Sequence, residues 1–180
     1  MSEEQASTGL SEFSLGTAWL HLATLWAMAV ALPLLQLYDE SPEFLIARGN
    51  AWPDLLVFTV ALLALPPTIM VGLEWLADRV GVRRWAHLAF VALLVAVLAI
   101  QLLKEEFDPA RRSITLAALL IGAAVAYLYA RGRFLPSVLT VLSPAPVVIG
   151  VWFLAFSSAS ELLWPKGTPC LLYTSDAADE

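Results

Sequence analysis

The sequence predicts an all-α polytopic membrane protein, with about five transmembrane helices in an up-down bundle. Hydrophobic residues make up 59% of the chain and charged residues 14%, and the mean hydropathy is +0.75. Soluble globular domains contain about 45–50% apolar and about 25% charged residues. The charged residues lie between long uncharged runs, and a helix formed by such a run is long enough to cross a hydrocarbon core of about 30 Å.

The first of these runs, residues 15–38, contains no charged residue. As a helix at about 1.5 Å per residue it would reach about 36 Å. We expect this span to be retained in the mature protein, because the polar tail 1–14 has no Lys or Arg and the run is too long for a signal-peptide h-region. The expected spans are 15–38, 55–76, 85–103, 113–130 and 136–157, within a membrane domain covering 15–163.

Small residues recur at four-residue spacing within these spans, which places them on one face of a helix and allows close helix approach. The first span carries Ala23, Ala27 and Ala31, and the fourth carries Gly122, Ala126 and Ala130. Such faces also mediate assembly between copies of a membrane protein, so a homo-oligomer is one interpretation of them.

Pairs of prolines interrupt two of the expected spans, and Pro33 falls near the end of the first, where it can bend the last turn. Pro66 and Pro67 lie within the second, and Pro144 and Pro146 lie within the fifth. We expect helix kinks at these prolines, because proline has no amide donor and leaves a carbonyl that a neighbouring helix or water must satisfy. Transporters place binding sites at broken helices, but a kink without a matching partner more often determines shape.

Three polar residues lie in or beside the expected spans. His21 could act as a proton relay or a ligand, although a lone membrane histidine is more often a hydrogen-bonding residue between helices. Glu74 is interpreted as interfacial, either solvated or paired with Arg79. His87 begins the third span beside Arg83, a position typical of the lipid headgroup level.

The sequence contains no glycine-rich phosphate loop, HExxH, CxxC, GxSxG or paired-carboxylate pattern. We therefore predict no catalytic, cofactor-binding or metal-binding residue in this chain. The net charge of -6 comes with no basic patch interleaved with aromatic residues, so we expect no nucleic-acid partner. The lipid bilayer is the predicted partner.

The end of the sequence has an unusual composition. Residues 164–169 contain proline, glycine and lysine, as expected at the start of a linker. Residues 170–180, CLLYTSDAADE, resemble translated sequencing-adapter read-through, and we expect them to be non-native. The alternative is a genuine polar C-terminal tail.

The positive-inside rule does not decide the orientation, because five Lys or Arg residues lie on each side of the expected spans. The third loop, however, mixes its basic residues with Glu105, Glu106 and Asp108. This favours a cytoplasmic N-terminus and an external C-terminus for the multi-pass chain.

Several segments resemble the N-terminal membrane region of bacterial sulfatase-like hydrolases of the alkaline-phosphatase-like superfamily. They are WLHLATLWAMAVALPLLQLY, SPEFLIARG, ALLALPPTIM, HLAFVALLVAVLAIQLLKE and FLPSVLTVLSPAPVV, and the resemblance covers about 18–169. It implies a linker followed by a metal-dependent hydrolase domain on the outer side of the membrane, with a divalent metal held there. No catalytic residue can be carried over, because we expect that domain to be missing from this chain.

The sequence thus favours the membrane-anchoring region of a larger enzyme. Two other classes stay open: a self-contained transporter or channel component, and a small membrane subunit that assembles through its alanine and glycine faces.

Overall fold

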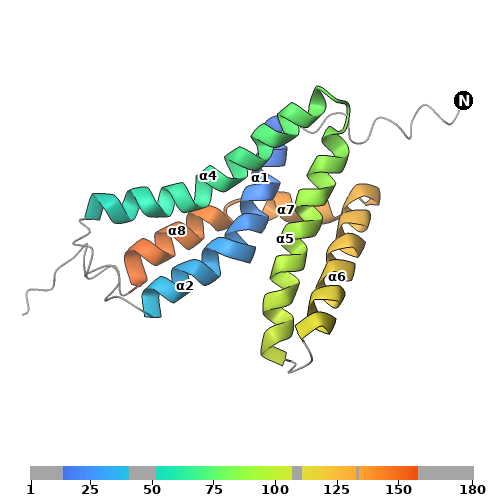
Figure 1. The fold of residues 1–180 in the computed structure, drawn as a ribbon. Coiled ribbons are helices and arrows are strands. Elements are labelled where there is room, and N and C mark those ends of the chain that lie inside the picture. The colour runs from blue at the N-terminus through green and yellow to red at the C-terminus, as the bar shows by residue number, and fades with distance from the viewer. Residues whose placement is uncertain (1–13, 41–51, 107–110, 133, 158–180) are drawn as a thin grey trace, which may run out of the picture.

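The computed structural model describes residues 14–40, 52–106, 111–132 and 134–157, and the regular structure in these ranges is helical (Figure 1). The helices in chain order are α1 (Leu15–Trp26), the π-helical segment η1 (Ala27–Ala31), α2 (Leu32–Glu40), α4 (Trp52–Asp78), α5 (Arg83–Glu106), α6 (Arg111–Arg131), α7 (Phe134–Val141) and α8 (Ala145–Phe156). The tail before Ser14, the segment SPEFLIARG, the linker 164–169 and the terminal residues 170–180 lie outside the described residues.

Among the described residues, five helical stretches are long and apolar enough to cross a membrane: Leu15–Glu40, Pro53–Asp78, Arg83–Lys104, Ser113–Arg131 and Phe134–Phe156. The predicted all-α class with five spans is therefore confirmed. Apart from the first span, between 17% and 28% of residues in the most apolar stretch of each are buried inside the protein. Most of their apolar surface faces outward, as expected for helices surrounded by lipid.

The first span is the central helix and is irregular in its middle. The Ser14 side chain accepts a hydrogen bond from the Thr17 amide at 3.2 Å and caps the start of α1. The π-helical segment η1 includes Ala29, whose carbonyl Pro33 leaves without an amide donor, so the irregularity begins before the last turn. Residues of the predicted small face, Ala23, Ala27 and Ala31, are all buried.

The second span, α4, is continuous through Pro66 and Pro67, and its two halves run in different directions in Figure 1. A tight turn then leads into α5. Gly81 has φ 74°, the Val82 amide donates to the Ala77 carbonyl at 3.0 Å and the Gly81 amide donates to the Asp78 carbonyl at 3.0 Å. This is a Schellman motif, in which glycine adopts the left-handed conformation that ends a helix.

Helices α5 and α6 lie side by side along their lengths (Figure 1). Gly122 makes this approach possible, because a Cβ at that position would overlap the carbonyl oxygen of Ala92 and lie 3.0 Å from the Ala96 Cβ. The predicted small face of the fourth span is therefore used within the protein, against α5.

The fifth span consists of two helices separated by a turn at 142–144. Pro144 stands immediately before α8, and Pro146 lies in its first turn, where a missing amide donor costs no helical hydrogen bond. These two prolines accordingly mark the start of a new helix.

Two apolar clusters hold the bundle together. The first contains Leu22, Val91, Ala126 and Leu139 among others, and joins α1, α5, α6 and α7. The second contains Leu35, Leu55 and Phe153, and joins α2, α4 and α8. The first span contributes to both clusters, so it connects the two halves of the protein.

Candidate functional site

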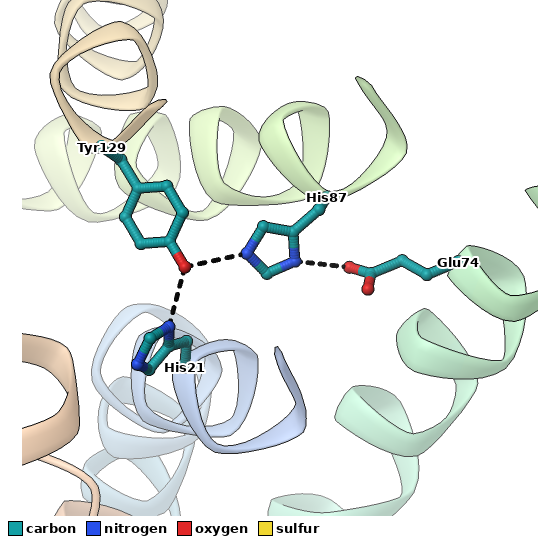
Figure 2. Close-up of polar contacts among 4 residues, drawn as sticks. All are labelled: His21, Glu74, His87 and Tyr129. Atoms are coloured by element: carbon teal, nitrogen blue, oxygen red, sulfur yellow. Dashed lines mark hydrogen bonds and ion pairs between the residues drawn. The ribbon is translucent and has the colours of Figure 1, made fainter. Parts of the chain in front are cut away.

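The main polar feature in the described residues is a chain of five side chains, one from each span. It consists of Glu74 of α4, His87 of α5, Tyr129 of α6, His21 of α1 and Thr140 of α7, and we call it the polar chain. Figure 2 shows four of its members, with the Tyr129 hydroxyl between the two imidazole rings and Glu74 on the far side of His87.

All five residues lie near the same end of the bundle. Helices α1, α5 and α7 begin at this end, and α4 and α6 finish there. At about 1.5 Å per residue, Tyr129 is about 3 Å from the end of α6, and Glu74 and His87 are about 6 Å from the ends of their helices. His21 and Thr140 are about 9 Å from the starts of α1 and α7. The polar chain thus occupies one end of the membrane domain.

The distances are those of good hydrogen bonds. Glu74 Oε1 lies 2.8 Å from His87 Nδ1, and His87 Nε2 lies 3.1 Å from the Tyr129 hydroxyl oxygen. That oxygen lies 2.7 Å from His21 Nδ1, and His21 Nε2 lies 3.0 Å from the Thr140 hydroxyl oxygen. Each bond joins two different helices, so the polar chain connects all five spans.

The chain is largely shielded from solvent. His21 and Glu74 are 0% exposed, Tyr129 is 2% exposed and the His87 side chain is 13% exposed. Glu74 Oε2 is buried and has no hydrogen-bond partner among the described residues. The carboxyl group therefore depends on His87, through Oε1, for its hydrogen bonding.

The direction of the last bond follows from hydroxyl chemistry. The Thr140 hydroxyl donates its only proton to the Pro136 carbonyl at 2.9 Å, so it must accept from His21. His21 consequently carries a proton on Nε2. Because the Tyr129 hydroxyl also has one proton, it donates to one histidine and accepts from the other.

The structure brings all three predicted polar positions together. His21 is an interhelical hydrogen-bonding residue, as the more frequent behaviour of membrane histidines indicated. The prediction that Glu74 is solvated or paired with Arg79 is wrong, because Glu74 is buried against His87. The Arg79 guanidinium instead stacks 4.4 Å from the ring centre of Trp75.

Tyr129 and Thr140 were not predicted as site residues. A usable signal exists for Tyr129, because Gly122, Ala126 and Tyr129 follow i, i+4, i+7 spacing and therefore share a helix face. Tyr127, two residues earlier, falls on another face and is 56% exposed. Thr140 gives no comparable signal, since its role depends on where the fifth span is interrupted.

Two of the carbonyls that prolines leave without an amide donor accept hydrogen bonds from neighbouring helices. Pro66 leaves the Leu62 carbonyl without its usual amide donor, and the Trp26 indole donates to this oxygen at 2.9 Å. Pro33 does the same to the Ala29 carbonyl, which accepts from the Gln101 side chain at 2.6 Å. These bonds give the kinked positions a structural role in α1–α4 and η1–α5 packing.

No group of three or more His, Cys, Asp or Glu side chains suited to a metal ion occurs within the ranges that the structure describes. The polar chain offers protonatable groups joined in a line by hydrogen bonds.

The helices and the polar chain together define a polytopic, all-helical membrane protein. Comparisons with protein families, with curated proteins and with solved structures find no match to this chain.

Proposed function

We propose that this chain is the membrane-anchoring N-terminal region of a bacterial sulfatase-like hydrolase. Its catalytic domain, with the divalent metal, would lie outside the present sequence on the C-terminal side. The observation that supports anchoring is that four of the five spans bury at most 28% of their most apolar stretch inside the protein. That surface suits a lipid environment, and the segments quoted above support the sulfatase-like assignment.

The proposed location is the bacterial plasma membrane, with the N-terminus in the cytoplasm and the C-terminus outside. This arrangement places the proposed hydrolase domain on the outer side. It also places the α4–α5 turn, which is flanked by Arg79, Arg83 and Arg84, on the cytoplasmic side.

The intact gene tests this proposal. We expect the coding region downstream of residue 169 to continue into a hydrolase domain with metal-binding residues. A natural reading frame that continues into a different kind of domain, or that stops after residue 180, would contradict it.

A second candidate function is a self-contained transporter or channel component. The observation that favours it is the convergence of His21 and Glu74 in one buried polar chain, because ionisable residues inside membrane proteins commonly mark ion and proton pathways. Proton flux across vesicles containing the purified protein tests this alternative. We expect His21→Ala and Glu74→Gln to abolish the flux if the alternative is correct, and unchanged flux in both variants would exclude it.

A further inference from the structure

The polar chain has two self-consistent arrangements of its hydrogen bonds on the same heavy atoms. Thr140 accepts from His21 Nε2 in both of them. In the first, the Tyr129 hydroxyl donates to His21 Nδ1 and accepts from His87 Nε2. In the second, the hydroxyl donates to His87 Nε2 and accepts from His21 Nδ1. Each of the four bonds holds one proton in either arrangement.

We propose that the polar chain is a proton-binding and proton-transfer site, in which one proton equivalent moves between Glu74 and His21 through His87 and Tyr129. The observation that carries this inference is the unbroken set of contacts at 2.7–3.1 Å from a buried carboxyl group to a buried imidazole. Contacts of this length allow proton transfer without movement of the helices.

The transfer balances atom by atom. The carboxyl proton of Glu74 passes to His87 Nδ1, and His87 releases the proton of Nε2 to the Tyr129 oxygen. Tyr129 releases its hydroxyl proton to His21 Nδ1, while His21 keeps the proton on Nε2. Glu74 becomes a carboxylate and His21 becomes an imidazolium, and both His87 and Tyr129 are neutral before and after.

Two other charged groups at this end of the described helices stack on aromatic rings outside the chain. Arg79 of α4 stacks on Trp75, and Arg131 of α6 stacks 5.2 Å from the ring centre of Tyr127. The remaining ones are Asp78 of α4 and Arg83 and Arg84 of α5, and helices α7 and α8 contribute none. The contacts described above join four ionisable groups, His21, Glu74, His87 and Tyr129.

A chain of this kind can serve an anchoring domain or a transporter, so the inference does not rest on the proposed function. The chain begins near the α4–α5 turn, where the His87 side chain is 13% exposed, and it ends at the exposed Thr140. Proton exchange with the surroundings is expected at His87.

Histidine-selective ¹⁵N labelling tests the inference directly, because His21 and His87 are the two histidines in the sequence. Purified protein in lipid nanodiscs would be followed by NMR across about pH 4 to pH 9. We expect both histidines to show common transitions, since coupled groups titrate as one unit. In Tyr129→Phe we expect separate transitions, with midpoints at least about tenfold apart in proton concentration. Tyr127→Phe is the matched control and should leave the common transitions unchanged.

Different midpoints in the unsubstituted protein, no transition in this pH range, or a common transition that survives Tyr129→Phe would each overturn the inference. A second measurement keeps it testable if Tyr129→Phe does not fold. Infrared difference spectra of the unsubstituted protein should contain a carboxylic acid band that Glu74→Gln removes, and this band should change at the histidine midpoint. An absent band, or one that changes at another midpoint, would overturn the inference equally.

Discussion

The Tyr129 hydroxyl is the central connection of the polar chain, because it contacts both histidines within hydrogen-bond distance. Its ring is 2% exposed and packs edge-on against His21, with 5.9 Å between ring centres. A phenol in this position serves as donor and acceptor at once, and phenylalanine would keep the ring and lose both functions.

We expect Tyr129→Phe to lower the free energy of unfolding by about 1–2 kcal/mol, because two buried hydrogen bonds are lost and two imidazole nitrogens lose a partner. Unfolding by SDS in mixed micelles measures this. Tyr127→Phe should change the value by less than about 0.5 kcal/mol, since Tyr127 is exposed. Equal effects of the two substitutions would show that the hydroxyl has no special role.

At the residue scale the sequence allowed some of this site to be predicted. His21, Glu74 and His87 are noticeable because ionisable side chains are rare within apolar runs. The Glu74–His87 pair was missed because Arg79 is nearer to Glu74 along the chain and, unlike histidine, always carries a positive charge. The Schellman turn at Gly81 brings α5 back beside α4, and this tertiary effect places His87 against Glu74.

At the element scale, prolines and side-chain donors act together. Trp19 and Trp26 lie seven residues apart on α1 and donate to groups on either side of the Pro66–Pro67 pair, which are the Thr68 hydroxyl and the Leu62 carbonyl. The α1–α4 contact therefore depends on the Leu62 carbonyl, which is free to accept because Pro66 has no amide proton to donate to it.

A double-mutant cycle tests this dependence. We expect Trp26→Phe to destabilise the protein, and to cost about 1 kcal/mol less in a Pro66→Ala background, where the new amide can donate to the Leu62 carbonyl. The same micellar unfolding measurement gives both values. If Trp26→Phe costs the same in the two backgrounds, the indole bond does not compensate for the proline.

The close packing of α5 against α6 depends on the absence of a side chain at Gly122. We expect Gly122→Ala to cost about 1–3 kcal/mol of unfolding free energy, because its methyl group would overlap the Ala92 carbonyl oxygen and force the helices apart. Gly72→Ala is the matched control, since a Cβ at Gly72 meets nothing within 4 Å. A Gly122→Ala protein as stable as Gly72→Ala would show that the helices are less closely packed than described.

At the scale of the whole molecule, the number and approximate positions of the spans follow from the uncharged runs, because bilayer thickness sets helix length. The small faces of the first and fourth spans were also predictable from spacing. The π-helical segment and the sharing of one polar chain among all five spans were not, because both depend on how the helices pack. A sequence pattern describes one helix at a time. The polar chain forms only when the five spans pack with one end of each close together.

The most direct test of this arrangement is the sidedness of the helix ends. Cys170 would be replaced by serine, and single cysteines would be introduced at Val80, Gly132 and Lys104 in separate variants. Sealed membrane vesicles would then be treated with a membrane-impermeant thiol reagent. We predict that Val80→Cys and Gly132→Cys are labelled from one side and Lys104→Cys from the other. Labelling of Val80→Cys and Lys104→Cys from the same side would contradict the five-span arrangement and the common location of the polar chain.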